Sequence, residues 1–198
     1  MYLIGIGGGT CSGKSTLARR LRRRLGAGCS LVPMDNYYLA RRVGESLEER
    51  AALNHDLPGA FDWSLLRAHL RALGEGEAVE MPLYDFALHN RTSLTKTVEP
   101  REVVVLEGLF ALHDREIRAA ISPGIFLDST TEQRRLRRLY RDQAERGAER
   151  AYSERKFDSM VEPAYHLHVE PTRRWADLVS DNLDEAEAAV ADRLAGLL

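Results

Sequence analysis

The chain has 198 residues, a length typical of one domain or of one domain with a small lobe. Hydrophobic residues make up 44% of it and charged residues 29%, and the formal net charge of −2 argues against a dedicated nucleic-acid binder, which is normally basic. No apolar run reaches the length of a membrane span, the first expected strand leaves no room for a signal peptide, and Cys11 and Cys29 lack metal-site spacing. We therefore expect a cytoplasmic protein with a single domain over 1–198 and no membrane or nucleic-acid partner.

The clearest motif lies near the start of the chain. Residues 8–15 read Gly-Gly-Thr-Cys-Ser-Gly-Lys-Ser, the G-x-x-x-x-G-K-[ST] spacing of a phosphate-binding P-loop. An apolar strand is expected before it at 2–6 and an amphipathic helix after it at 16–25. This order turns backbone N–H groups and the positive end of a helix toward one anion. Lys14 would reach the β- and γ-phosphates of a nucleotide, and the Ser15 hydroxyl would bind Mg²⁺. The expected nucleotide-binding residues are Gly8, Gly9, Thr10, Cys11, Ser12, Gly13, Lys14, Ser15 and Thr16.

Strand and helix patterns alternate along the rest of the chain. Further strands are expected at 29–34, 102–106, 125–127 and 176–179. Helices are expected within 41–53 and at 62–73, 129–145, 153–167 and 184–198. The segment 75–98 reads as a β-hairpin with arms at 79–83 and 93–98, and Ser129-Thr-Thr-Glu132 has the pattern of a capping box. The alternation predicts an α/β fold, a three-layer sandwich with a parallel sheet covered by helices on both faces.

Two acidic residues follow expected strands of this sheet. Ligands of such sheets bind at the carboxyl ends of the strands, so Asp35 and Glu107 should lie at one edge with the P-loop. Val103–Leu106 followed by Glu107 has the form of a Walker B strand, whose acid would hold Mg²⁺ opposite Ser15. Asp35 could accept the proton of an attacking hydroxyl, or it could cap a turn after its strand.

Arginines crowd the helix expected at 129–145. Arg134, Arg138 and Arg141 are spaced to share one face of the helix. Cations there could stabilise a transferring phosphoryl group, or they could form a solvated face balanced by neighbouring acids. We favour a function for the cluster, because Glu145-Arg-Gly147 reads as a hinge into a lid over 141–153.

At this point the chain resembles the uridine/cytidine kinase family, within the wider group that includes phosphoribulokinase and nicotinamide riboside kinase. The segment 82–91, Pro-x-Tyr-Asp-Phe-x-x-His-x-Arg, is the most specific match. The other matching stretches occur in the order of the family at 8–16, 34–38, 54–63, 106–109, 137–147 and 169–177.

The resemblance implies a P-loop kinase that uses ATP or GTP with Mg²⁺ to phosphorylate the 5′-hydroxyl of uridine or cytidine, and that assembles as a homo-oligomer. It implies Asp35 as the general base and places Ser15, Glu107 and Asp35 at the metal. Its remaining implied roles are ribose binding by Asp56 and Arg138, base binding by Tyr84, Phe86 and His89, and triphosphate contacts from the lid residues Arg141 and Arg146.

Alternatives remain open at the acceptor end. Tyr84 and Phe86 could simply belong to the core, since they are two residues apart on a strand, and His89 could be structural. The chain departs from the family pattern at His55, Leu57, Gly59, Ala148, Lys156 and 180–182. A kinase of the same fold with another small hydroxyl acceptor is therefore an alternative, as is a nucleotide-binding regulator without turnover.

Overall fold

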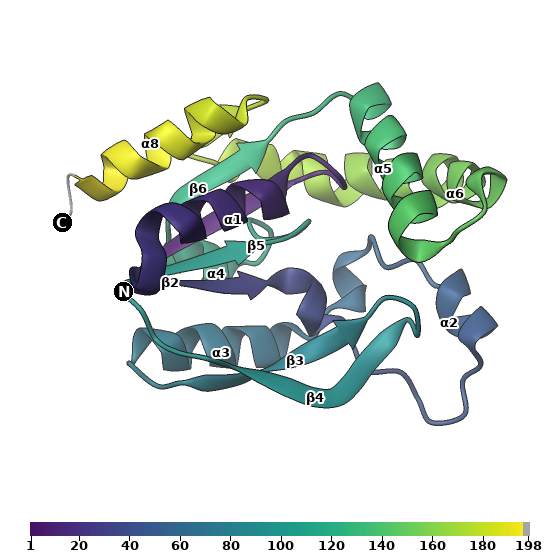
Figure 1. Cartoon of the computed structure of the whole chain (residues 1–198), viewed down its shortest axis with the longest axis horizontal. Helices are drawn as coiled ribbons and strands as arrows, with labels where there is room; N and C mark the ends of the chain where they lie inside the picture. Colours follow the sequence, from purple (N-terminus) through teal and green to yellow (C-terminus); the bar gives the residue numbers. More distant parts are fainter. Residues whose placement is uncertain (196–198) are drawn as a thin grey trace.

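A five-stranded parallel sheet forms the centre of the molecule, which is described here from a computed structural model over residues 1–195 (Figure 1). The strand order is β2-β5-β1-β6-β7. The strands are β1 (Tyr2–Gly8), β2 (Cys29–Pro33), β5 (Val103–Glu107), β6 (Ile121–Leu127) and β7 (Leu178–Ser180). Every neighbouring pair is parallel, which confirms the predicted α/β fold.

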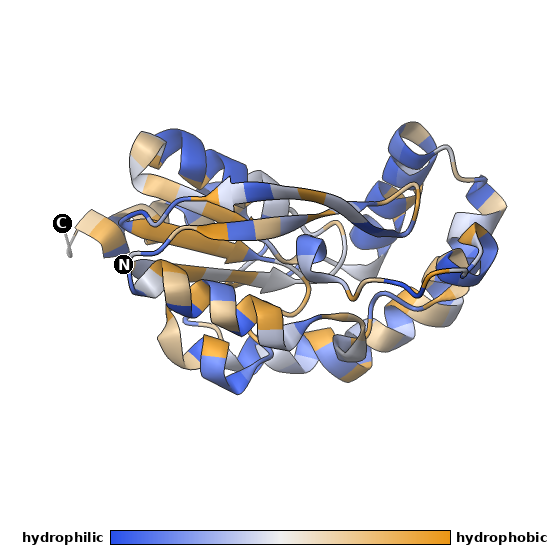
Figure 2. Ribbon diagram, turned by 90° about the horizontal axis from the view of Figure 1, so that it is seen from below, coloured by the Kyte–Doolittle hydropathy of each residue, from blue (hydrophilic) through white to orange (hydrophobic). Residues whose placement is uncertain are grey.

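The two faces of the sheet carry separate hydrophobic clusters. Successive side chains of a strand point to opposite faces, so Val103 and Val105 of β5 join one cluster while Val104 and Leu106 join the other. Figure 2 shows mostly hydrophobic strands at the centre of the molecule, as expected for a sheet with both faces buried. Gly5 of β1 is needed for close packing, since a Cβ there would lie 2.5 Å from Ile121.

Helices cover both faces of the sheet. Helices α1 (Lys14–Leu25) and α8 (Leu183–Ala195) pack on one face, and α3 (Trp63–Gly74) and α4 (Arg115–Ala120) pack near the other (Figure 1). The remaining helices are α2 (Leu47–Ala52), α5 (Thr131–Arg146), α6 (Arg150–Lys156) and the single turn α7 (Glu162–Ala164). None of the helices in residues 1–195 is long and apolar enough to cross a membrane.

A two-stranded hairpin lies outside the main sheet. Strands β3 (Val79–Asp85) and β4 (Asn90–Val98) pair antiparallel and run beside α3 in Figure 1. Asn36, just after β2, fastens the hairpin to the main domain, because its Oδ1 accepts a hydrogen bond from the backbone N–H of Tyr84 at 3.1 Å. The turn of the hairpin is thereby held near the carboxyl ends of the sheet strands.

The structure corrects several predicted boundaries. The capping box of α5 uses Thr130 and Gln133, one residue later than predicted, and the carbonyl of Ser129 accepts a hydrogen bond from the Arg134 side chain. The helix expected at 153–167 begins at Arg150 and continues through π-helical and 3₁₀ turns to Trp175.

Smaller differences concern short elements. Helix α4 was not predicted, although Asp114 caps it by accepting from two backbone N–H groups. The last strand lies at 178–180 rather than 176–179, and β4 begins three residues before the predicted arm. The final helix was predicted to reach residue 198; its described part ends at Ala195, and residues 196–198 lie outside the described range.

Candidate active site

The P-loop joins β1 to α1 in a tight curl. Gly8 and Gly13 have φ angles of 136° and 105°, in the left-handed region that favours glycine. A Cβ on Gly8 would lie 2.5 Å from the carbonyl oxygen of Leu127, so the loop also approaches β6 too closely for a side chain. Helix α1 begins at Lys14 and directs its N-terminus into the loop. This is the backbone geometry that an anion requires.

The loop has polar groups that fit a phosphate. The hydroxyl oxygen of Ser12 is buried and has no hydrogen-bond partner within residues 1–195. Lys14 is also buried, and its Nζ donates to the carbonyl of Gly9 at 2.6 Å. Burial lowers the pKa of Lys14, an effect that the carboxylates of Glu107 and Asp35 oppose. A phosphate would satisfy the orphaned hydroxyl and would accept from the ammonium group.

Oxygen donors suited to Mg²⁺ meet beside the loop. The hydroxyl of Ser15 donates to Glu107 Oε1 at 2.9 Å, and Asp35 lies in the turn that follows the neighbouring strand β2. Burial raises the pKa of both carboxyl groups, and Asp35 raises that of Glu107 further. Mg²⁺ binds through one or two carboxylates together with waters and phosphate oxygens, so these three side chains fit that ion.

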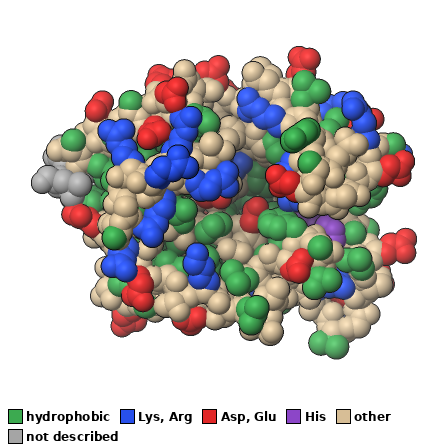
Figure 3. Space-filling model, viewed as in Figure 1, with side chains coloured by type: hydrophobic (Ala, Val, Ile, Leu, Met, Phe, Trp, Pro, Cys, Tyr) green, Lys and Arg blue, Asp and Glu red, His purple; other side chains and the backbone are tan. Residues whose placement is uncertain are grey.

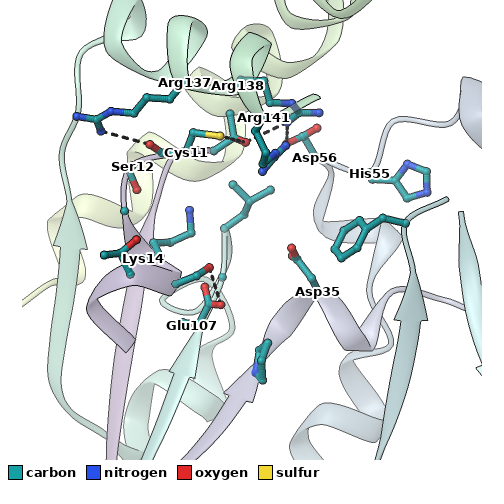
Figure 4. Close-up of a pocket in the computed structure, with 18 of the residues that line it drawn as sticks. Cys11, Ser12, Lys14, Asp35, His55, Asp56, Glu107, Arg137, Arg138 and Arg141 are labelled. Atoms are coloured by element: carbon teal, nitrogen blue, oxygen red, sulfur yellow. Dashed lines mark hydrogen bonds and ion pairs between the residues drawn. The ribbon is translucent and has the colours of Figure 1, made fainter. Parts of the chain in front are cut away.

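A cavity of about 810 Å³ connects the loop to the hairpin. Figure 3 shows it as a hollow with basic side chains on one side and a histidine on the other. In Figure 4, Lys14, Glu107 and Asp35 surround its lower part, while Arg138 and Arg141 lie above it with Asp56 and His55 beyond. Every residue predicted to bind the nucleotide, the metal ion or the acceptor lines the cavity except Gly8 and Gly9, which form the base of the loop.

Arg138 links the P-loop to the other end of the cavity. Its Nη1 donates to the hydroxyl of Thr10 at 3.0 Å and lies 3.8 Å from the carboxylate of Asp56. Asp56 itself is 7% exposed, although it lies in a segment between short helices. Burial alone would lower the pKa of Arg138, but Asp56 and Asp142 outweigh it and keep the guanidinium charged.

Asp142 is a buried acid that the sequence pattern indicates only as one of the acids that balance the arginines. Its carboxylate accepts from Arg138 Nε at 3.0 Å and from Arg141 Nη2 at 3.1 Å, and it lies 3.5 Å from Arg146 Nη1. Burial would raise the pKa of Asp142, but the three arginines outweigh it and the pKa lies below its usual value. The i,i+4 spacing of Asp142 to Arg138 and to Arg146 could have predicted these ion pairs from the sequence. One carboxylate thus orients three arginines of the cavity.

Arg134 departs from the predicted arginine cluster. It shares a helix face with Arg138, but it is 1% exposed and its Nη2 lies 2.9 Å from the Glu162 carboxylate. Its guanidinium also stacks 3.8 Å from the ring centre of Tyr165. Arg134 therefore braces α5 against the helical turns that follow α6, and it does not line the cavity.

Other arginines of this region form a solvated face balanced by acids, which was the alternative considered for the cluster. Arg135 pairs with Asp158, and Arg150 pairs with Glu154 at 3.1 Å. Arg150 does not line the cavity.

Aromatic side chains form the far end of the cavity. Tyr84 is the penultimate residue of β3, and Phe86 lies beyond the strand end with its ring 5.2 Å from that of Tyr84. Arg146 covers Phe86, with 4.6 Å between the guanidinium carbon and the ring centre. His89 stands in the hairpin turn and stacks on His55 at 5.6 Å. Tyr84 belongs to a hydrophobic cluster of the core and also lines the cavity, as Phe86 does.

Comparison with known proteins supplies the context of this site. Residues 3–189 match the model of the Phosphoribulokinase / Uridine kinase family. The chain is 42% identical to the uridine kinase of Halobacterium salinarum over 90% of this chain and 79% of that relative, and 42% identical to the uridine kinase of Deinococcus deserti over 90% and 86%.

Among solved structures, the chain resembles a putative fructose transport system kinase from Silicibacter. The TM-score is 0.75 at 27% identity, and the match covers 90% of this chain and 88% of that one. On the family match and on the extent of its identity with these relatives, the chain belongs to the phosphoribulokinase/uridine kinase family and is a kinase.

Proposed function

We propose that this protein transfers the γ-phosphoryl group of ATP or GTP to the 5′-hydroxyl of uridine or cytidine. The observation that carries the proposal is the lining of one cavity. The P-loop lines one end of it and Asp35 its middle, and the aromatic residues of the hairpin line the other end together with His55 and His89. Relatives at 42% identity named uridine kinase favour this acceptor over another small hydroxyl compound.

The donor nucleotide is proposed to bind at the P-loop. Backbone N–H groups of residues 9–14 and the N-terminus of α1 would hold its β-phosphate, and Lys14 would leave the Gly9 carbonyl to contact the γ-phosphate. Ser15, Asp35 and Glu107 would hold Mg²⁺ at this site. When bound, the ion neutralises phosphate charge that develops during transfer.

Asp35 is proposed as the general base. A carboxylate at this position can accept the proton of the attacking hydroxyl while its oxygen bonds to the γ-phosphorus and the bond from that phosphorus to the leaving nucleoside diphosphate breaks. Its burial raises its pKa and makes it a stronger proton acceptor than a solvated aspartate. Asp56 and Arg138 would orient the acceptor by binding the ribose hydroxyls, since their paired charges already lie on the cavity wall.

The hairpin end is proposed to select the base. Tyr84 and Phe86 offer aromatic surface, and their perpendicular arrangement lets one face and one edge contact a pyrimidine. His89 adds a group that can donate or accept a hydrogen bond. Each of these groups suits an uncharged, planar ligand.

The lid is proposed to span residues 141–153 of a single domain. Gly147 ends α5 with a φ of 63°, and the N–H of Ala148 donates to the backbone carbonyl of Asp142 at 2.9 Å. Movement about this point would bring Arg141 and Arg146 onto the phosphates and exclude water. We also propose that the protein forms a homo-oligomer, as the family resemblance implies.

A coupled turnover assay with ATP and Mg²⁺ tests this function. The acceptors are uridine, cytidine, purine nucleosides, nicotinamide riboside and ribulose 5-phosphate, each over a concentration series. We expect kcat/KM to be highest for uridine or cytidine. Highest turnover with a different acceptor would overturn the hairpin assignment, and nucleotide binding without turnover on any acceptor would favour a regulator.

A further inference from the structure

His55 makes two hydrogen bonds that fix the state of its ring. Its Nδ1 lies 3.1 Å from the backbone carbonyl oxygen of Leu53, and its Nε2 lies 3.2 Å from the hydroxyl of Tyr84. The ring also packs edge-on against Tyr38, with 5.3 Å between ring centres. His55 therefore stands between the backbone and a side chain at the base end of the cavity (Figure 4).

The direction of these hydrogen bonds follows from the chemistry of the partners. A carbonyl oxygen only accepts, so the hydrogen of the His55 ring must be on Nδ1. Burial, with Arg41, Lys156 and His89 nearby, lowers the pKa of His55 to about 4, and the ring is neutral at pH 7. In the neutral ring Nε2 carries a lone pair and accepts. The hydroxyl of Tyr84 must then be the donor in the contact with His55.

Tyr84 consequently has no hydrogen to offer a ligand. A phenol has a single O–H, and this one is directed at His55, so only oxygen lone pairs remain for the cavity. The Tyr84 ring is held against rotation by Tyr38 and Phe86, with ring centres 5.0 and 5.2 Å away. His89 imposes no such direction, because its ring nitrogens have no hydrogen-bond partner within the described residues and can serve either role.

We propose that His55 determines base preference by fixing Tyr84 as a hydrogen-bond acceptor, which favours a pyrimidine with an amino group at its 4-position over one with a carbonyl. The inference rests on the proposed function and deepens it, since it concerns which pyrimidine nucleoside the kinase prefers. An amino group donates to the Tyr84 oxygen, whereas a carbonyl oxygen meets another acceptor. The site should therefore prefer cytidine to uridine.

A double-mutant cycle tests whether His55 acts through Tyr84. The ratio of kcat/KM for cytidine to that for uridine is measured in the wild type, in His55→Phe, in Tyr84→Phe and in the double variant. Phenylalanine at 55 keeps a ring but frees the Tyr84 O–H to donate. We expect the ratio to fall about three- to tenfold in His55→Phe, the value of one neutral hydrogen bond. We expect no further fall when His55→Phe is added to Tyr84→Phe.

His55→Gln and the KM for ATP serve as controls. The amide oxygen of glutamine can accept from Tyr84 in place of Nε2, so this variant should retain most of the wild-type ratio. The KM for ATP should stay within about twofold in every variant, since the P-loop is untouched. An unchanged ratio in His55→Phe would overturn the proposal, as would an equal fall in the presence and absence of the Tyr84 hydroxyl.

Nitrogen-15 NMR of histidine-labelled protein tests the hydrogen bonds without turnover. We expect the His55 signals of a neutral ring protonated at Nδ1, with the Nε2 resonance shifting in Tyr84→Phe. A ring protonated at Nε2 would overturn the proposed hydrogen bond from the Tyr84 hydroxyl to His55, whatever the activity. A wild type that phosphorylates neither nucleoside would instead overturn the proposed function, and the base preference with it.

Discussion

Asp142 accepts a hydrogen bond from Arg138 at 3.0 Å, and Arg138 in turn donates to Thr10 of the P-loop at 3.0 Å. The same carboxylate holds Arg141 and Arg146. In the proposed function, a lid arginine would exchange this carboxylate for phosphate when a nucleotide binds. Asp142 therefore fixes the positions of these three arginines of the cavity before a ligand binds.

Replacing Asp142 by asparagine should disperse the three arginines. We expect kcat/KM for ATP to fall about ten- to a hundredfold, because hydrogen bonds to charged groups contribute about 1.5 to 3 kcal/mol each. Glu132→Gln is the matched control, since Glu132 is an exposed acid on the same helix, and it should change kcat/KM less than twofold. Equal effects of the two substitutions would mean that Asp142 has no special role.

Replacing Asp35 by asparagine should remove the base while keeping the shape of the site. We expect kcat to fall about 10² to 10⁴-fold, the usual contribution of general base catalysis. Calorimetric binding of an ATP analogue in the presence of Mg²⁺ should weaken much less than kcat falls. Turnover near that of the wild type would show that the proton goes elsewhere.

Arg134 should matter for stability rather than for chemistry. Arg134→Met removes the guanidinium partner of the partly buried Glu162 carboxylate, which keeps its contacts with Thr131 and His166, and we expect the free energy of unfolding in urea to fall by about 2 kcal/mol. Arg135→Ala breaks an exposed pair with Asp158, which solvent screens, and should leave the free energy of unfolding close to that of the wild type. If Arg134→Met unfolded like the wild type but lost turnover, Arg134 would belong to the active site after all.

His55 should make the stability of the protein depend on pH. Its pKa is about 4 in the folded state and 6.5 without these contacts, so the unfolded chain binds more protons between these values. Stability contributed by the neutral ring is therefore present above pH 6.5 and is lost as the pH falls toward 4.

Urea unfolding at several pH values measures this effect. Relative to His55→Gln, the wild type should lose stability as the pH falls across this range. The limiting slope for one proton is about 1.4 kcal/mol per pH unit, and the observed slope should be smaller because the ring is partly exposed. The difference between the two proteins should be constant above pH 7. Parallel stability curves from pH 7 to pH 4 would show that His55 keeps an ordinary pKa.

Local patterns in the sequence predicted the sheet and the P-loop edge of the cavity. The motif at 8–15 predicts a tight phosphate-binding loop. The rule that ligands bind at the carboxyl ends of the strands was enough to predict that Asp35 and Glu107 line the same cavity as this loop. The cap of α5 was missed by one residue because three consecutive hydroxyl residues, 129–131, could each cap the helix, and the sequence pattern does not distinguish them.

Contacts between distant segments could not be predicted in this way. Tyr84 meets His55 across 29 positions of the chain, and Arg138 meets Thr10 across 128. Arg134 and Arg138 share a helix face but end in different surroundings, because the turns at 157–169 cover only the first of them. Helical spacing shows which side chains share a face and does not show what covers that face.

The most direct test of the proposed function is the identity of the product. The protein is incubated with ATP, Mg²⁺ and either cytidine or uridine, and phosphorus-31 NMR identifies the phosphorylated position, with 5′-deoxyuridine as the matched acceptor that lacks the attacked hydroxyl. We predict nucleoside 5′-monophosphate in amounts equal to the ADP released, and no phosphorylated product from 5′-deoxyuridine. Phosphate at the 2′ or 3′ position, or ADP released without a phosphorylated nucleoside, would contradict the account.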